Sequence, residues 1–181
     1  MSLTTVTSSD PLLFSADLIP DHVKQALPQG YTARPLKASD YERGVLEVLR
    51  VLTTVGEISR AQFQSLFDYW HKHNDTYFTM VITDGSDKVV AVGSVVLERK
   101  IIHQCGLVGH IEDIAVLSTQ QGNKLGLRLI HALTDIGRAQ GAYKIILDCS
   151  EHNVPFYEKC GYTKSGTQMS IKFSDFKKGV L

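Results

Sequence analysis

The chain has 181 residues, of which 43% are hydrophobic, so it can form one hydrophobic core of ordinary size but not two comfortable domains. Its 19 basic residues balance 19 acidic ones, which leaves no net charge to hold a nucleic-acid backbone or an anionic membrane surface. No stretch reaches the roughly 20 apolar residues that a membrane helix needs, and the N-terminus has the pattern of neither a secretion signal nor a transit peptide.

An N-terminal arm is expected to precede the folded domain. Residues 1–28 mix Ser, Thr and Pro with short apolar pieces, which is typical of an arm that is partly docked and partly disordered. Residues 29–181 are expected to form one domain that opens with "YTARPL", whose alternation predicts a strand. Two helices follow: "SDYERGVLEVLRVLTTVG", capped by Ser39 or Asp40 and stopped by Gly56, and then "SRAQFQSLFDYWHKHN".

The rest of the chain alternates between strand and helix patterns. "TYFTMVIT" and "KVVAVGSVVLER" flank the turn "DGSD" and predict a hairpin, and "GLVGHIEDIAVL" predicts a third long strand. A helix is expected to begin close to Gly122 and to end at Gly141. The apolar run "AYKIILDC" predicts a strand buried on both faces, "NVPFYEKC" a short helix, and "YTKSGTQMSIKF" a final strand.

Two adjacent carboxylates, Glu112 and Asp113, interrupt the third long strand. Neighbouring side chains of a regular strand point to opposite faces, so the two cannot act together on one substrate as a glycosidase pair does. Either the strand is irregular here, with exposed backbone groups and one carboxylate facing a ligand, or both residues lie on a solvated face. The residues alone leave both possibilities open.

The turn "QQGNKLG" follows that strand directly and opens a helix. Its backbone N–H groups converge where the helix dipole favours an anion such as a pyrophosphate. The turn is neither a Walker P-loop nor a dinucleotide fingerprint. A plain helix start explains it equally well.

Taken together, "DIAV", this turn, the helix, the apolar strand and "NVPFYEKCGY" resemble the GCN5-related N-acetyltransferase (GNAT) superfamily. Five blocks, "VLTTVGEIS", "ERKIIH", "GHIEDIAV", "YKIILDCS" and "NVPFYEKCGY", resemble more specifically the eukaryotic (fungal-type) glucosamine-6-phosphate N-acetyltransferases, from about Tyr31 to Lys172. The resemblance implies a single-domain α/β (α+β) GNAT fold with a mixed central β-sheet flanked by helices. It implies direct acetyl transfer from acetyl-CoA to the amine of D-glucosamine 6-phosphate, in UDP-N-acetylglucosamine biosynthesis, by a homodimer with the sugar site at the subunit interface.

The resemblance implies that acetyl-CoA is bound largely by backbone groups. The N–H of Ile114 would meet the oxyanion, and the backbone from Ile114 through Ala115 to Val116 would pair with the pantetheine. The pyrophosphate would lie on the turn formed by Gln121, Gly122, Asn123, Lys124, Leu125 and Gly126, in which Lys124 stands where the superfamily usually has glycine or alanine. Asn153 would be a further coenzyme contact, although it is also a competent helix cap.

The resemblance also implies roles for side chains near the reacting groups. Tyr157 would donate a proton or a hydrogen bond to the departing thiolate, whereas residue type alone favours core packing. Asp148 would orient the sugar amine, with a simple turn cap as the alternative. Glu112 and Asp113 would bind the sugar, and no metal is expected.

Four further positions match the family's substrate contacts: Thr54, Lys100, His103 and Lys172. Lys172, on the expected final strand, would act in trans across the dimer. Without the resemblance, an isolated surface lysine is best explained as solvated. Two other functions stay open: an acetyltransferase for another amine, such as a polyamine, an aminoglycoside or a protein, and a CoA-binding domain without turnover.

The three cysteines, Cys105, Cys149 and Cys160, are an odd number without the spacing of metal ligands. They indicate a reducing compartment, and so a cytoplasmic protein, rather than a disulfide framework. Neither Cys149 nor Cys160 has a histidine in a nucleophile arrangement, so buried and inert thiols are expected.

Overall fold

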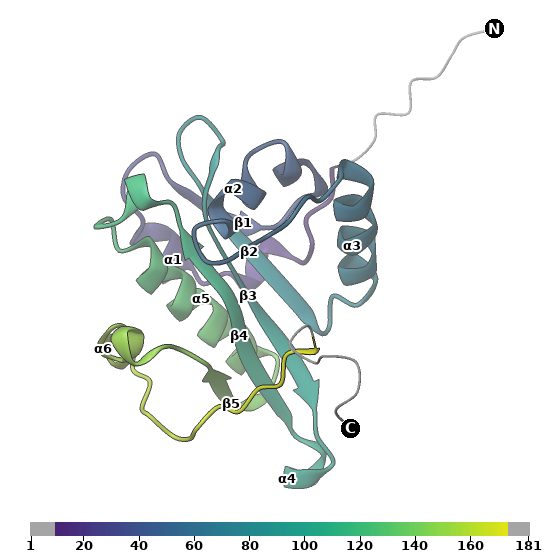
Figure 1. Ribbon diagram of the computed structural model, residues 1–181, viewed down its shortest axis with the longest axis vertical. Helices are drawn as coiled ribbons and strands as arrows, with labels where there is room; N and C mark the ends of the chain where they lie inside the picture. Colours follow the sequence, from purple (N-terminus) through teal and green to yellow (C-terminus); the bar gives the residue numbers. More distant parts are fainter. Residues whose placement is uncertain (1–9, 174–181) are drawn as a thin grey trace, which may run out of the picture. The chain divides into compact units, whose positions relative to one another are not determined.

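The computed structural model describes residues 10–173 (Figure 1). The chain divides into two compact units, Met1–Leu147 and Asp148–Leu181, which are described in turn. The first unit contains β1 (Thr32–Pro35), β2 (Tyr77–Thr83), β3 (Val89–Arg99), β4 (Leu107–Val116), β5 (Ala142–Leu147), α1 (Asp21–Gln25), α2 (Val45–Leu49), α3 (Arg60–Lys72), α4 (Ile102–Cys105) and α5 (Leu125–Ala139). The second contains α6 (Val154–Lys159).

The five strands of the first unit form one sheet in the order β1-β2-β3-β4-β5. Neighbours from β1 to β4 are antiparallel, and β5 runs parallel to β4, so the expected mixed sheet and the hairpin of β2 and β3 are confirmed. Helix α5 packs closely on one face, because a Cβ added to its Gly137 would lie 2.5 Å from Ile145 and 3.7 Å from Val95. At the start of β2, Trp70 of helix α3 stacks on Tyr77.

The helix predicted from Ser39 or Asp40 to Gly56 is wrong in extent. The chain instead forms a 3-10 helix, Ala38–Tyr41, and then the short α2, which ends before the loop of residues 50–57. The break falls at Gly44, whose φ of 93° is left-handed and cannot continue a helix. α3 begins as predicted after Ser59, whose side chain forms a capping box with Gln62.

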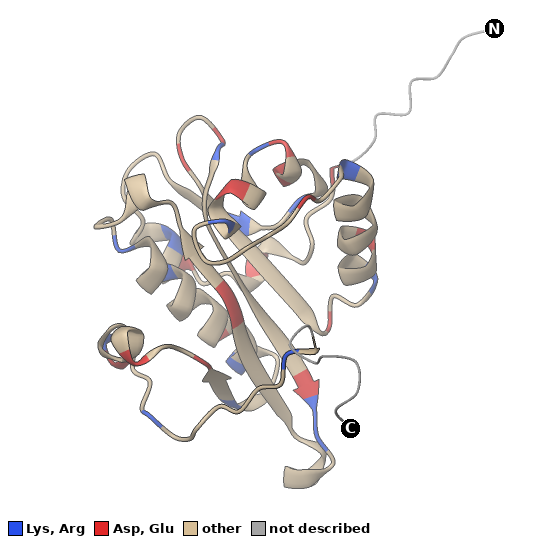
Figure 2. Ribbon diagram, viewed as in Figure 1, with Lys and Arg blue, Asp and Glu red and all other residues tan. Residues whose placement is uncertain are grey.

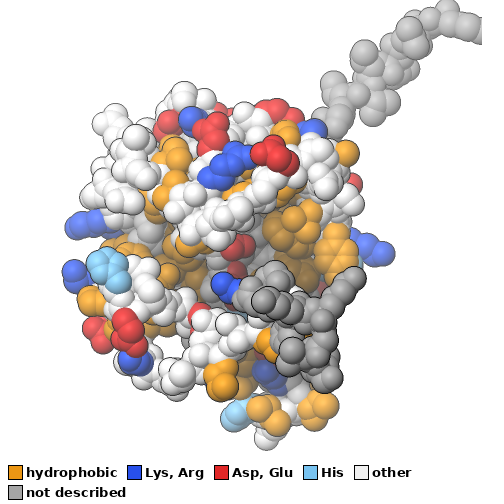
Figure 3. All heavy atoms as spheres, viewed as in Figure 1, with side chains coloured by type: hydrophobic (Ala, Val, Ile, Leu, Met, Phe, Trp, Pro, Cys, Tyr) orange, Lys and Arg blue, Asp and Glu red, His pale blue; other side chains and the backbone are white. Residues whose placement is uncertain are grey.

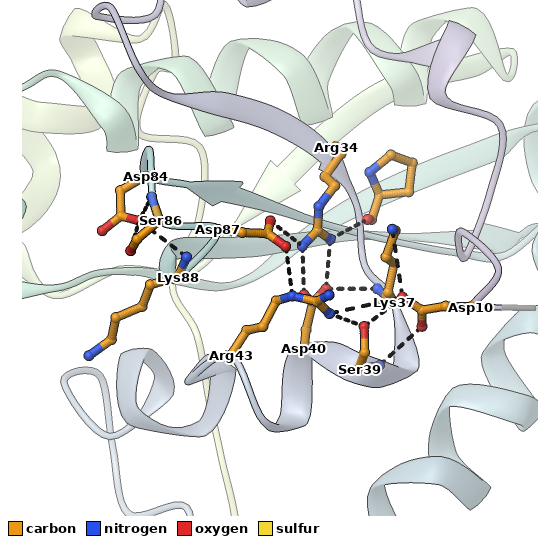
Figure 4. Close-up of polar contacts among 11 residues, drawn as sticks. Asp10, Arg34, Lys37, Ser39, Asp40, Arg43, Asp84, Ser86, Asp87 and Lys88 are labelled. Carbon is orange, nitrogen blue, oxygen red and sulfur yellow. Dashed lines mark hydrogen bonds and ion pairs between the residues drawn. The ribbon is translucent and has the colours of Figure 1, made fainter.

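A buried carboxylate, Asp40, holds the start of this region against the sheet (Figure 4). It receives two hydrogen bonds from the guanidinium of Arg34 on β1, at 2.7 and 2.8 Å. Asp87, in the turn between β2 and β3, pairs with Arg43 at 2.7 Å and with Arg34 at 3.6 Å. Two aspartates and two arginines therefore connect three separate segments of the first unit.

The docked part of the expected N-terminal arm begins at the first described residues. Within residues 10–28, the side chains of four residues are buried in the core: Leu13, Phe14, Ile19 and Val23. Asp10 accepts a hydrogen bond from the Ser39 hydroxyl at 2.6 Å. Burial alone would raise the pKa of Asp10, but this bond and the nearby cations Lys37 and Arg43 lower it. The first nine residues of the arm lie outside the described part of the chain.

Two predictions about the last part of the chain are corrected. β5 is half-buried to exposed rather than buried on both faces, because among the described strands it pairs only with β4, at the edge of the sheet. The predicted final strand is absent from the described residues 163–172, which are irregular and exposed and have no ladder partner within the described chain. The short helix is confirmed as α6, with Pro155 in its first turn.

Candidate active site

Strand β4 continues beyond the end of its neighbour β5. The pairing of β4 with β5 ends at Ile111 and Leu147, whereas its pairing with β3 continues to Val116. The backbone from Ile114 to Val116 therefore has its ladder on the β3 side, and among the described residues no strand pairs with its opposite edge. An extended polyamide chain can add to a sheet edge of this kind.

The same stretch of β4 contains a bulge. Ser94 pairs with Glu112 and Val92 with Ala115, so two β4 residues, Asp113 and Ile114, stand opposite the single residue Gly93. Asp113 has a left-handed φ of 55°. Of the two alternatives that the sequence left open, the backbone is thus irregular here, while both carboxylates are also exposed. Figure 2 shows them as the red segment of β4.

Gly93 leaves room for a side chain of this bulge. A Cβ on Gly93 would lie 2.4 Å from the Ile114 side chain, which packs across the glycine. Glu112 and Asp113 are both exposed. Beside Glu112 on the same face, the hydroxyls of Ser94 and Thr79 form a buried hydrogen bond of 2.8 Å. The bulge therefore combines a carboxylate, a buried hydroxyl pair and an open backbone edge within a few residues.

The turn before α5 is exposed and partly left-handed. The helix begins at Leu125 rather than close to Gly122, because the capping residue Lys124 has a left-handed φ of 58°. An added Cβ on Gly122 would meet nothing within 4 Å. The side chains of Gln121, Asn123 and Lys124 are exposed beside the helix N-terminus. Gln121 donates its N–H to the Ser118 oxygen, and the first N–H groups of α5 follow the turn. The N-terminal end of the helix dipole and the Lys124 charge make this turn suited to a pyrophosphate group.

The left-handed Lys124 explains why glycine suits this position. A residue with a Cβ in the left-handed region is strained by about 1–2 kcal/mol, and glycine relieves this strain. Glycine also loses more backbone entropy on folding, which cancels about half of the gain in stability. We expect Lys124→Gly to raise the free energy of unfolding by about 0.5–1 kcal/mol in urea denaturation. Lys124→Ala removes the same charge but keeps the Cβ, so it should give no gain. An equal gain for both variants would contradict the backbone explanation.

Besides the two carboxylates of the bulge, the expected substrate residues of the first unit lie in two further places. Thr54 lies in the loop of residues 50–57, which lines an open hollow of about 560 Å³. Lys100 donates to Glu98 at 2.5 Å, and Glu98 also contacts the Nε2 atom of His110 at 2.9 Å. These two bonds lower the pKa of Glu98. The positive charge of Lys100, which the resemblance assigns to the phosphate of the substrate, is thus partly balanced by the carboxylate of Glu98.

His103 lies in α4, in the connection between β3 and β4. His103, Gln104 and Cys105 all have left-handed φ angles, so α4 is a turn rather than a regular helix. The His103 ring lies 4.4 Å from that of Tyr143 on β5. Next to it, Ile101 and Ile102 are exposed, and Figure 3 shows hydrophobic side chains at the lower end of the view, where Figure 1 places α4.

Four candidate residues belong to the second unit: Asp148, Asn153, Tyr157 and Lys172. Asp148 accepts a hydrogen bond from Gln168 at 2.9 Å. Asn153 precedes α6, but its side chain makes no capping bond, so the alternative of a side-chain cap is not what the structure has. Lys172 is exposed in the irregular C-terminal segment.

Tyr157 is half-buried on α6, with the rings of Phe156 and Tyr162 at 5.0 and 6.5 Å. Burial, and then the neighbouring Cys149, Cys160 and Tyr162, raise its pKa above the ordinary 10.0. The phenol is therefore protonated at neutral pH and able to donate a proton.

The cysteines are all unpaired. Burial raises the pKa of the Cys160 thiol, which agrees with an inert group. The prediction that Cys149 is buried is wrong, because β5 ends at Leu147 and leaves Cys149 in an exposed connection. Within residues 10–173, no group of three or more His, Cys, Asp or Glu could hold a metal ion, and no helix is long and apolar enough to cross a membrane.

Several residues around the site were missed from the sequence. The buried pair of Thr79 and Ser94 carried no signal, because hydroxyls in a strand are ordinary residues. Tyr31 and Gln120 were missed because they are 89 positions apart and meet only in the folded chain, where the Tyr31 hydroxyl donates to the Gln120 side chain.

Known proteins resemble this chain over most of its length. The model of the Acetyltransferase (GNAT) family matches residues 44–162. Glucosamine 6-phosphate N-acetyltransferase of Candida albicans is 52% identical over 147 residues, which are 81% of this chain and 99% of the relative. Glucosamine 6-phosphate N-acetyltransferase 1 of Dictyostelium discoideum is 47% identical over 78% of this chain and 90% of the relative. The crystal structure of glucosamine-6-phosphate N-acetyltransferase from Arabidopsis thaliana matches with a TM-score of 0.77 at 38% identity, over 79% of this chain and 98% of that one.

Proposed function

This chain belongs to the acetyltransferase (GNAT) family, and on that basis we propose that it is an acetyl-CoA-dependent N-acetyltransferase acting on D-glucosamine 6-phosphate. The products are N-acetyl-D-glucosamine 6-phosphate and CoA. The acceptor is supported by the likeness to the Candida albicans and Dictyostelium discoideum enzymes, whose names state it.

One structural observation carries the acetyl transfer. β4 runs past β5 with a bulge at Asp113 and then leads into the exposed turn before α5. The free backbone edge from Ile114 to Val116 suits the amide groups of pantetheine, and the turn suits the pyrophosphate. We assign the N–H of Ile114 to the thioester oxygen, where negative charge develops.

The reaction is a direct transfer. The amine nitrogen of the sugar attacks the thioester carbon, the C–S bond breaks, and the amine loses one proton while the thiolate gains one. Tyr157 donates to the thiolate, and Glu112, Asp113 and Asp148 bind the sugar and orient its amine. The amine of an amino sugar is less basic than that of lysine and is partly neutral near pH 7, so a strong base is not required.

The acceptor is tested by measuring thiol release from acetyl-CoA with four compounds at equal concentration: glucosamine 6-phosphate, glucosamine, glucose 6-phosphate and spermidine. Release with the first alone supports the proposal, because it requires both the amine and the phosphate. Release with spermidine, or equally with glucosamine, favours an acetyltransferase for another amine. CoA binding without release from any compound favours a domain without turnover.

Asp148 provides a second test of the proposed site. We expect Asp148→Asn to lower turnover by about 10²-fold, the size of loss that a misplaced reacting group causes, while CoA affinity and the melting temperature stay near those of the wild type. The control is Glu151→Gln, which changes an exposed acid of the same unit that pairs with Lys164 at 2.6 Å. Loss of folded protein in Asp148→Asn would favour the turn-cap role instead.

The homodimer is also part of the proposal, with the sugar site at the subunit interface and Lys172 acting in trans. It is supported by apolar side chains that are exposed to solvent, since burying them at an interface would be favourable. Met169, Ile171 and Phe173 in the C-terminal segment are 93%, 63% and 81% exposed. Edge strand β5 and the exposed Ile101 and Ile102 are further surfaces that a partner could cover.

Mixed dimers test the trans arrangement. We expect a heterodimer of one Tyr157→Phe subunit and one Lys172→Ala subunit to keep about half of the wild-type turnover, because one of its two sites then combines both intact residues. If Lys172 acts within its own subunit, both sites carry a defect and the heterodimer is as weak as either homodimer. Sedimentation of a monomer at assay concentrations would contradict the dimer itself.

The proposal also includes a cytoplasmic location and a role in UDP-N-acetylglucosamine biosynthesis. Three unpaired cysteines support a reducing, cytoplasmic compartment. The product, an N-acetylated hexosamine phosphate, is chemically suited to UDP-N-acetylglucosamine biosynthesis.

A further inference from the structure

The turn that precedes α5 is joined to the start of the sheet by a small hydrogen-bonded cluster. The hydroxyl of Tyr31, the residue before β1, donates to the side-chain oxygen of Gln120. The side-chain amide of Asn123 lies 3.4 Å from the Tyr31 hydroxyl and 3.5 Å from the same Gln120 oxygen. Gln120 ends the 3-10 helix Ser118–Gln120, so the cluster contacts the turn at its entrance and in its middle.

The turn has few other constraints of its own. Its residues from Gln121 to Lys124 are exposed, and the capping residue Lys124 is left-handed and makes no side-chain capping bond. Tyr31 and Gln120 are half-buried. The half-buried Tyr31, next to β1, therefore holds the exposed turn in place through the contacts of its hydroxyl with Gln120 and Asn123.

We infer that Tyr31 is a positioning residue for the coenzyme turn. This inference rests on the proposed function, since it assigns that turn to the pyrophosphate of acetyl-CoA. A loop that is already ordered loses less conformational entropy when its ligand binds, so the hydroxyl strengthens coenzyme binding without touching the coenzyme. The acceptor site and the chemical step do not depend on it.

The test compares Tyr31→Phe with the wild type by calorimetric titration with CoA and by steady-state kinetics. Losing one hydrogen bond of this kind raises the Kd for CoA and the KM for acetyl-CoA about three- to tenfold. kcat and the KM for glucosamine 6-phosphate stay within about twofold. Tyr41→Phe is the matched control, because the half-buried Tyr41 hydroxyl donates to the backbone oxygen of Ile58, away from the turn.

A double-mutant cycle shows whether Tyr31 acts through Gln120. Gln120→Met removes the acceptor, and the Tyr31→Phe, Gln120→Met double variant should bind CoA no more weakly than either single variant. Fully additive losses, or an unchanged Kd for CoA in Tyr31→Phe with only a lower melting temperature, would overturn the inference and leave the proposed function standing. A wild-type chain that binds no CoA would overturn both.

Discussion

Replacing Tyr157 with phenylalanine is expected to lower turnover by about 10²-fold or more while CoA affinity stays close to that of the wild type. The reason is that removing a general acid costs about 10² to 10⁴ in rate, whereas the phenyl ring keeps the packing against Phe156 and Tyr162. The measurement is single-turnover acetyl transfer at saturating acetyl-CoA and glucosamine 6-phosphate, together with a CoA titration.

The pH dependence separates the phenol from other donors. The pKa of Tyr157 is raised above 10.0, mainly by burial, so the wild-type rate should fall only above pH 10 as the phenol loses its proton. Tyr157→Phe should lack this alkaline decline and keep a low rate. Because the pKa of the Tyr157 phenol is higher in the folded chain than in the unfolded chain, the protonated phenol contributes to the stability of the fold. This contribution is complete below pH 10 and is lost as the pH rises through the folded-state pKa.

Tyr162→Phe is the control for that experiment, since it removes a neighbouring phenol after the same helix. Its turnover should stay within about twofold of the wild type. If Tyr157→Phe keeps full turnover with an unchanged alkaline limb, Tyr157 is a packed aromatic and another group protonates the thiolate. Equal losses in both variants would indicate a general effect on α6.

The sequence was most informative where the signal was local. Two adjacent carboxylates in an apolar strand left an irregular strand and a solvated face open, and the structure shows a bulge opposite Gly93. Ser59 and Gln62 form a capping box that can be read from their spacing alone. Each of these features depends on residues within a few positions of one another, so no tertiary information was needed.

The errors arose where tertiary contacts or special backbone angles decide the outcome. Gly44 lies inside a helical pattern, and only its left-handed φ shows that the helix breaks there. The alternation in "YTKSGTQMSIKF" is a strand pattern, but a strand also needs a neighbour, and the described chain supplies none. The apolar run of β5 indicated burial on both faces, yet the strand lies at the edge of the sheet.

Contacts between distant segments could not be predicted at all. Tyr31 and Gln120 are ordinary residues in sequence, and their importance comes only from the fold that brings β1 beside the turn. Arg34 and Asp40 are only six positions apart, but charged residues in a sequence are typical of a solvated surface, so their burial carried no signal. In the structure they form the most buried ion pair of the described chain, with the Asp40 side chain at 0% and the Arg34 side chain at 13% exposure.

This buried pair gives the second large expected effect. Asp40→Asn should lower the free energy of unfolding by about 3–5 kcal/mol, the usual cost of removing one partner of a buried pair. The replacement places an amide N–H₂ group, a donor, where the Arg34 guanidinium and the Lys37 N–H both donate to the carboxylate. Arg34 then keeps only its longer pair with the exposed Asp87, although burial disfavours its charge and Asp40 is the main group that raises its pKa again.

Asp87→Asn is the matched control, because it makes the same chemical change beside the same two arginines. The Asp87 side chain is 56% exposed, so its pairs with Arg43 and Arg34 should contribute no more than about 1 kcal/mol. Asp87 also has a left-handed φ of 62°, which asparagine tolerates well. Urea denaturation of both variants at pH 7 gives the comparison, with a change in midpoint at constant slope as the expected form. Similar small losses in both would show that burial does not make the Asp40 pair special. The connection between β1, the 3-10 helix Ala38–Tyr41 and the turn of β2 and β3 would then be held by apolar packing instead.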